Sequence, residues 1–144
     1  MVIEPPTHRY RYKKLETERT IRLVTILPGS ISDDIHLEIQ HRHLDHEAPA
    51  YEALSYVWGV SDSCGEVFIS NVAVDVTPNL FDALRCLRYG DKSRIMWIDA
   101  IAIKQEDLAE KSTQLPLMRF IYPRAAATVV YVGDADEDTA WAFN

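Results

Sequence analysis

Glycine is scarce in this chain, and its scarcity excludes two kinds of nucleotide-binding site. Only 5 of the 144 residues are glycine, and neither a G-x-G-x-x-G nor a G-K-[ST] motif occurs. Dinucleotide-binding and P-loop sites of the glycine-rich kind are therefore excluded. The G-x-S-x-G elbow that presents a nucleophilic serine is also absent.

Cysteine and long apolar runs are equally rare. The two cysteines, Cys64 and Cys86, cannot make a disulfide framework, which favours a protein of the reducing cytoplasm. No apolar run reaches the ~18 residues that a membrane-spanning helix needs, so we expect no membrane span. Residues 1–12 are polar and contain proline, unlike a secretory signal. These absences predict a cytoplasmic location.

Basic residues are fewer than acidic residues in this chain. Lysine and arginine number 15 against 22 aspartates and glutamates, which gives a net charge of −7. Nucleic acids and anionic membranes attract basic surfaces, so neither is an expected partner. The hydrophobic fraction of 47% is ample for the core of one domain. We expect a polar leader at 1–18 and a single domain at 19–144.

An acidic run near the end of the sequence resembles the beginning of a further helix. Asp134, Asp136, Glu137 and Asp138 precede an apolar segment, as in the first turn of a helix. The sequence stops at Asn144, soon after that start. We therefore expect it to be the amino-terminal fragment of a longer chain.

Apolar periodicity predicts the strands. Alternating or continuous apolar residues indicate strands at 21–27, 35–40, 51–57, 95–101 and 127–132, and a hairpin at 67–76. No glycine follows Asn71 in the hairpin, so we expect a turn that is distorted or longer than two residues.

Two helices lie between these strands. Thr77 can cap a helix that begins with Pro78, and a second helix is expected at 106–122. Pro116 removes a backbone donor, so we expect a break near 112–116. The order of helix, strand, helix and strand requires crossover connections and favours parallel pairing. We predict an α/β fold in which helices flank a mostly parallel central sheet, extended by an antiparallel β-hairpin.

A ligand-binding rim is predicted where the parallel strands end, because ligands bind there in open sheets. The carboxyl ends of three predicted strands are Trp58-Gly59, Asp99 to Gln105, and Gly133-Asp134. The side chains that could converge on this rim are Ser55, Trp58, Gly59, Asp99, Gln105, Asp107 and Glu110. Tryptophan can stack on a nicotinamide or base ring, and a carboxylate can bind ribose hydroxyls. The alternative is that Asp99 only caps the next turn and Trp58 lies in the core.

Four histidines lie near an aspartate in the sequence, and such a group could form a zinc site. His36, His41, His43 and His46 lie close in sequence to Asp45. Zinc sites use such ligands, but cysteine is absent from this segment, which reads as a solvated loop. We predict no metal site.

Several separate motifs resemble the fungal heterokaryon incompatibility (HET) domain over residues 20–135. Two blocks are the most diagnostic, Tyr51 to Gly59 (YEALSYVWG) and Met96 to Gln105 (MWIDAIAIKQ). The others are Thr77 to Leu80, Ala83-Leu84, Leu87-Arg88, Asp107, Glu110, Gln114, Met118, Ile121-Tyr122, Ala125 and Val129 to Gly133. The sequence departs from the family at Ala102 and Lys104, which replace the usual Cys and Asn, at Val72, and at Pro116.

The resemblance implies a function. HET domains trigger programmed cell death when incompatible fungal cells fuse, a form of self/non-self recognition and innate immunity. Such a signalling module would act by regulated self-association or with protein partners, and it requires no cofactor. A third possibility is a divergent copy that folds without signalling.

A remote resemblance to Toll/interleukin-1-receptor (TIR) domains implies an alternative. It suggests a TIR- or flavodoxin-like sheet and cleavage of NAD, which would deplete the cell of that substrate. Under this hypothesis Glu137 and Asp99 would be the catalytic residues. An acidic helix start that has no function explains Glu137 equally well.

Overall fold

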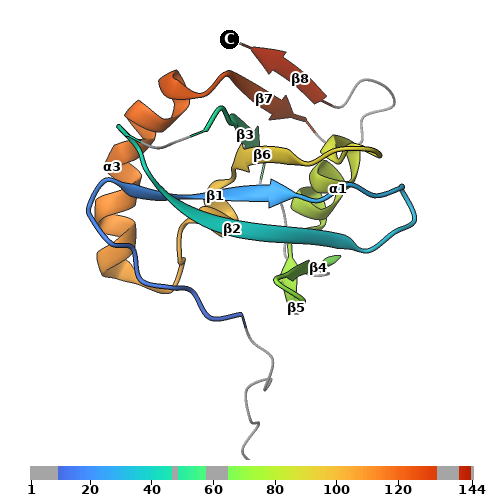
Figure 1. The fold of residues 1–144 in the computed structure, drawn as a ribbon, viewed down its shortest axis with the longest axis horizontal. Coiled ribbons are helices and arrows are strands. Elements are labelled where there is room, and N and C mark those ends of the chain that lie inside the picture. Colours follow the sequence, from blue (N-terminus) through green and yellow to red (C-terminus); the bar gives the residue numbers. More distant parts are fainter. Residues whose placement is uncertain (1–9, 47–48, 58–64, 133–139, 144) are drawn as a thin grey trace, which may run out of the picture.

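The structure is a computed structural model that describes residues 10–46, 49–57, 65–132 and 140–143. Within these ranges eight strands form one sheet in the order β5-β4-β2-β1-β6-β3-β7-β8 (Figure 1). The strands are β1 (Thr20–Ile26), β2 (Ile35–His43), β3 (Glu52–Tyr56), β4 (Gly65–Ile69), β5 (Val72–Val76), β6 (Arg94–Trp97), β7 (Ala127–Tyr131) and β8 (Ala140–Phe143). The helices are α1 (Pro78–Leu87), α2 (Asp99–Ala102) and α3 (Leu108–Arg124).

The sheet is mixed, so the prediction of a mostly parallel sheet is wrong, although the α/β class is confirmed. β3 runs parallel to both β6 and β7, and β2 runs parallel to β4. The other four pairings, β1–β2, β1–β6, β4–β5 and β7–β8, are antiparallel. The reason is that β1 and β2 pair with each other and enter the middle of the sheet, where β1 lies against β6. This topology gives no support to a TIR- or flavodoxin-like arrangement.

The β4–β5 hairpin at the edge of the sheet is confirmed, but its turn differs from expectation. Only Ser70 and Asn71 separate the two strands, and their φ angles are 49° and 67°. Positive φ at both central residues is the geometry of a tight two-residue turn that matches the twist of the strands. Asparagine tolerates this conformation well, so the turn stays short without glycine.

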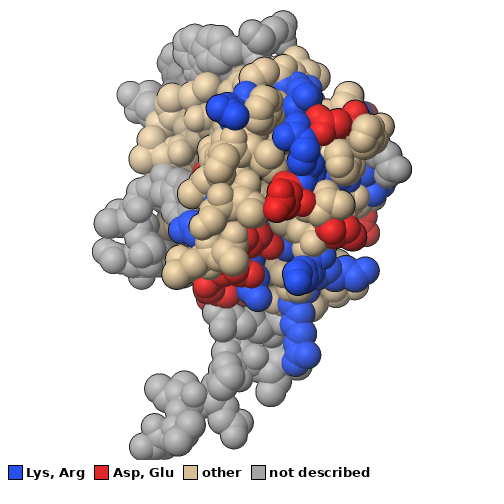
Figure 2. Space-filling view, turned by 90° about the vertical axis from the view of Figure 1, so that its left-hand side faces the viewer, with Lys and Arg blue, Asp and Glu red and all other residues tan. Residues whose placement is uncertain are grey.

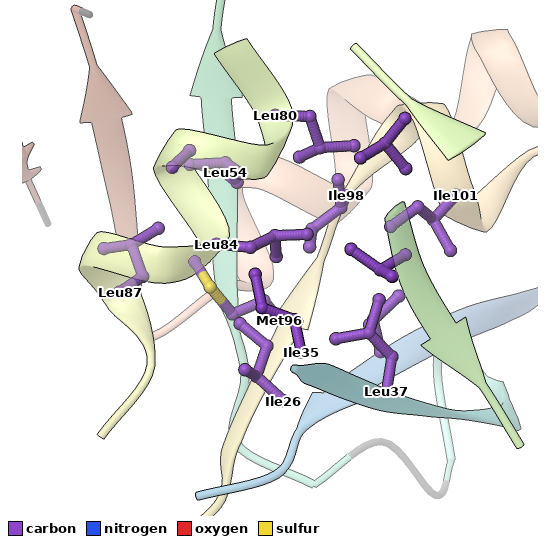
Figure 3. Close-up of a cluster of buried hydrophobic side chains, with 14 of the residues drawn as sticks. Ile26, Ile35, Leu37, Leu54, Leu80, Leu84, Leu87, Met96, Ile98 and Ile101 are labelled. Atoms are coloured by element: carbon purple, nitrogen blue, oxygen red, sulfur yellow. The ribbon is translucent and has the colours of Figure 1, made fainter. Parts of the chain in front are cut away.

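Helices cover both faces of the sheet. Neighbouring residues of β1 point to opposite faces, Leu23 toward a cluster with α3 and Val24 toward a cluster with α1. The α1 cluster joins Leu80, Leu84 and Leu87 to side chains of β1, β2, β3 and β6 (Figure 3). The α3 cluster is built from Ile21, Leu23, Leu44, Tyr51, Trp97, Ala102, Ile103, Leu117 and Ile121. The two clusters place α1 and α3 on opposite sides of the sheet.

The predicted break in the second helix is wrong, because α3 continues through Pro116. Buried side chains hold the turns on either side of the proline. Gln114 donates from Nε2 to the carbonyl of Thr20 at 2.9 Å, and Leu117 and Ile121 pack in the core. Tertiary packing of this kind outweighs the local cost of proline. Pro116 itself is exposed.

The strand expected at 95–101 ends early. β6 stops at Trp97, and the next residues turn into the short helix α2, which starts at Asp99. Ala102 donates its N–H to the Ile98 carbonyl at 2.7 Å, which closes the turn. Apolar residues continue through this turn because both Ile101 and Ala102 are buried, and that continuity made it resemble a strand.

In the part of the chain that the structure describes, no helix is both long and apolar enough to cross a membrane.

Gly65 provides a test of the packing between β4 and α1. A Cβ added at Gly65 would overlap with Cβ, Cγ and Cδ2 of Phe81, whereas one added at Gly90 would meet nothing within 4 Å. We expect Gly65→Ala to lower the free energy of unfolding by about 1–3 kcal/mol, because the overlap includes Phe81 Cβ and only a shift of the backbone of α1 or β4 can relieve it. Gly90→Ala should change stability by no more than about 1 kcal/mol. Urea unfolding of both variants checks this, and equal stabilities would contradict the packing described.

Candidate functional site

The described ends of β3, β6 and β7 lie at one edge of the sheet. Ala53 of β3 is opposite Trp97 of β6, and Tyr56 is opposite Tyr131 of β7. Because the three strands are parallel, their carboxyl ends form a common edge, which we call the rim. Asp99 follows β6 at this edge. Trp58, Gly59, Gly133 and Glu137 lie outside the described residues.

Asp99 and two tyrosines form the polar part of the rim. Burial raises the pKa of Tyr56 and of Tyr122, and the negative charge of Asp99 raises both further. Both phenols are therefore protonated at neutral pH. The Tyr122 hydroxyl donates to the Leu54 carbonyl at 3.3 Å. The Tyr122 hydroxyl is engaged by the Leu54 carbonyl and the Tyr56 hydroxyl is buried, so neither phenol is an open donor at the rim.

Gln105 lies beside Asp99 but is engaged by the backbone. Its Nε2 donates to the carbonyls of Asp99 and Ile103, both at 3.0 Å. These bonds hold the turn that leaves α2. Asp99 is the first residue of α2, and the N-cap position before it belongs to Ile98, which makes no side-chain cap hydrogen bond.

Ser55 does not face the same way as Tyr56. Successive side chains of a strand point to opposite faces, and Tyr56 packs toward the α1 cluster. Ser55 is half-buried and points toward the α3 side of the sheet. It therefore joins the rim only through the backbone of β3.

Asp107 and Glu110 lie at the start of α3, and both make structural contacts there. The Asp107 carboxylate accepts a hydrogen bond from the N–H of Glu110 at 3.0 Å and so caps the helix. Glu110 forms a two-pronged ion pair with Arg22, with bonds of 2.8 and 2.7 Å. The side chain of Arg22 is 1% exposed and that of Glu110 is 10% exposed.

Further contacts surround this ion pair, which we call the Arg22–Glu110 pair. Arg22 donates from Nη1 to the Ala102 carbonyl at 2.9 Å and from Nη2 to the Lys13 carbonyl at 2.8 Å. Glu110 also accepts from the Lys104 N–H at 2.6 Å. The Tyr12 ring lies 4.7 Å from the guanidinium carbon. Four segments thus meet at one buried charge: the amino-terminal segment, β1, the end of α2 and the start of α3.

The sequence analysis did not identify Arg22. Its only local signal is a charged residue in a strand that is otherwise apolar or threonine, TIRLVTI. A buried arginine requires a partner and filled donors, because an isolated buried charge is very costly. That requirement could have directed attention to the acidic residues at the start of a neighbouring helix.

The histidines are distributed over several local contacts. His36 stacks on Phe68, His41 pairs with Glu16 at 2.7 Å, and the rings of His43 and His46 stack at 4.4 Å. In the described ranges, no group of three or more His, Cys, Asp or Glu side chains is arranged to hold a metal ion.

The Arg22–Glu110 pair predicts a specific dependence of stability on pH. Burial by itself raises the Glu110 pKa, but the hydrogen bonds from Arg22 and from the Lys104 N–H outweigh it, and the net pKa is lowered. The pair therefore contributes its full stability above the ordinary glutamate pKa of 4.5, and this contribution is lost as the pH falls through the lower, folded-state pKa. Glu110→Gln should cost about 3 kcal/mol at pH 7, because it leaves the Arg22 charge buried without a counter-charge.

Urea unfolding between pH 7 and pH 3 measures this effect. The stability difference between wild type and Glu110→Gln should shrink as the pH falls below 4.5. Glu18→Gln, at an exposed position of the amino-terminal segment, is the matched control and should unfold like wild type. A difference between wild type and Glu110→Gln that stays constant over the whole pH range would refute the linkage.

Comparisons with known proteins identify the family. The family described as heterokaryon incompatibility protein (HET) matches residues 51–143. Heterokaryon incompatibility protein 6, OR allele, of Neurospora crassa is 38% identical over 133 residues. That alignment covers 83% of this chain but 19% of the relative, so this chain spans a small part of the relative's length. No solved structure matches. The chain belongs to the heterokaryon incompatibility (HET) family.

Proposed function

We propose that this domain acts in fungal heterokaryon incompatibility and starts programmed cell death when genetically different cells fuse. The observation that carries the proposal is the 38% identity to the Neurospora incompatibility protein over 83% of the chain. The match includes the segments that build β3, β6, α2 and α3. Under this proposal the domain starts the response, and the part of the relative that lies outside the alignment has other roles.

Regulated self-association is the mechanism that we propose for the signal. A surface that switches between single and associated copies needs exposed groups of matching chemistry. α3 supplies part of such a surface, because Leu108 and Leu115 are 77% and 49% exposed on its outer side. A helix with apolar residues on its outer side commonly has a partner there.

Controlled expression in a filamentous fungus tests the proposed function. Induction of the chain should arrest growth and admit a membrane-impermeant dye, whereas Ile121→Asp should do neither at an equal protein level. Ile121 is fully buried, so this substitution unfolds the domain and controls for the burden of expression. Sustained growth of cells that accumulate the folded wild-type domain would argue against a death signal.

Light scattering tests the self-association separately. The mean molar mass of the purified wild-type chain should rise with protein concentration, because association follows mass action. A mass that remains that of one chain at every concentration would remove self-association from the mechanism.

Cleavage of NAD is the second candidate, and the rim favours it. Asp99 follows β6 at the edge where parallel sheets bind ligands, and a carboxylate there can accept hydrogen bonds from ribose hydroxyls. In this reaction water replaces nicotinamide at the ribose carbon and gives ADP-ribose. We expect nicotinamide release by the associated wild-type chain and at least about tenfold less by Asp99→Asn. Release no faster than in buffer alone would eliminate this candidate.

A further inference from the structure

The outer side of α3 carries a row of apolar and basic side chains, of which Leu108, Leu115 and Arg119 are exposed and Lys111 is half-buried. Lys111, Leu115 and Arg119 follow one another at intervals of four residues, and Leu108 lies one turn before them. We call these four residues the α3 stripe. Leu108 is 77% exposed and Leu115 is 49% exposed. Their positions lie opposite the buried residues Gln114, Leu117 and Ile121, so the stripe faces solvent.

Other positive charges extend the stripe. The guanidinium groups of Arg19, Arg119 and Arg124 all lie within 6 Å of the Phe120 ring centre, at 5.1, 4.8 and 5.6 Å. Asp45 is the acid that pairs with two of them, Arg19 and Arg124. Figure 2, which faces the α3 side of the molecule, shows lysine and arginine side chains interspersed with aspartate and glutamate side chains.

An acidic groove lies beside α1. The loop before β2, the start of β4 and the first turns of α1 enclose about 540 Å³. Four carboxylates line it, those of Asp33, Asp34, Glu66 and Asp82. Among the described residues that line it, Arg85 is the one basic residue, and it pairs with Asp82 at 3.3 Å. Ile31, 74% exposed, and Phe81 add apolar surface.

We propose that the α3 stripe of one copy docks in the acidic groove of a second copy. Leu115 would meet Ile31 and Phe81, while Lys111 and Arg119 would reach the carboxylates on either side. Helices commonly bind grooves through anchors at such spacings. The opposite charges of the two surfaces favour this occupant, because each copy carries both halves of the contact.

The placement of the two surfaces determines the kind of assembly. α3 and α1 cover opposite sides of the sheet (Figure 1). The groove lies at the α1 side, because residues of α1 line it. Different patches of the two copies would therefore meet, which makes the contact heterologous. Such contacts produce open chains of copies, or rings where the rotation closes. This inference rests on the proposed self-association and names its surface.

Charge reversal on each surface tests the proposal. The α3-reversed variant carries Lys111→Glu and Arg119→Glu, and the groove-reversed variant carries Asp34→Lys and Glu66→Lys. All four side chains lie at the surface or its margin, and thermal unfolding followed by circular dichroism verifies that each variant folds. We expect each variant to associate at least about tenfold more weakly than wild type, because like charges then face each other.

Restoration by combining the changes is the decisive measurement. The variant with all four reversals again presents opposite charges and should regain association in light scattering. Matched controls carry equal charge changes elsewhere at exposed positions: Arg11→Glu with Lys14→Glu, and Glu18→Lys with Asp91→Lys. Both controls should associate like wild type. Added salt should weaken association of the wild-type chain.

The outcomes separate this inference from the proposed function. If wild type associates and both reversed variants associate equally well, the surface is wrong while self-association stands. If only one of the two reversed variants fails, its surface takes part in association but the other does not, and the head-to-tail contact is overturned. If wild type stays a single chain at every concentration, both the inference and the proposed self-association fall. Loss in both reversed variants and recovery in the fourfold variant establishes the contact.

Discussion

The buried pair of Arg22 and Glu110 is the interaction on which the arrangement of this domain depends. Arg22 stands in a strand at the middle of the sheet with its side chain 1% exposed. A charge in that position requires a counter-charge and acceptors for its donors, and removing one partner costs about 3–5 kcal/mol. The chain meets the requirement with a carboxylate from α3 and carbonyls from α2 and from the amino-terminal segment. One electrostatic demand therefore fixes where α3 begins and how the turn after β6 is held, and the α3 stripe and the rim depend on those elements.

The central place of β1 explains why the sheet has two different halves. β1 separates β6, β3 and β7, which run parallel and end at the rim, from β2, β4 and β5, and of these β4 lines the acidic groove through Gly65 and Glu66. The rim and the groove thus belong to different parts of one sheet. A ligand at the rim would touch α2 and the carboxyl end of β3, while a partner in the groove would touch α1 and β4. Chemistry and association can consequently be altered by separate substitutions, which makes the two candidate functions distinguishable.

The sequence predicted the local elements well and the long-range pairings poorly. Apolar periodicity located β1, β2, β3, the β4–β5 hairpin and β7, because periodicity reports burial of one or both faces. Periodicity gave the wrong element at Ile101, because a buried helical turn and a buried strand both appear in the sequence as a continuous run of apolar residues. It failed at Pro116, where Gln114 and Leu117 hold a helix that local propensity would break. The insertion of β1 beside β6 and the contact of Arg22 with Glu110, 88 residues away, leave no pattern in neighbouring residues. Of the expected rim, Asp99 and Gln105 lie together, whereas Asp107 and Glu110 serve the start of α3.

The departures of this sequence from the family pattern bear on whether it is a divergent copy that folds without signalling. Ala102 and Lys104 stand where the family usually has Cys and Asn, in the segment that contacts the Arg22–Glu110 pair. Both residues meet the pair through backbone atoms, the carbonyl of Ala102 and the N–H of Lys104. Backbone contacts persist when side chains change, so these two departures leave the central interaction intact. Pro116 is likewise accommodated within a continuous α3. The physical constraint that organises the domain therefore survives at every one of these three positions, and a loss of signalling would have to arise at the rim, at the α3 stripe or at the acidic groove.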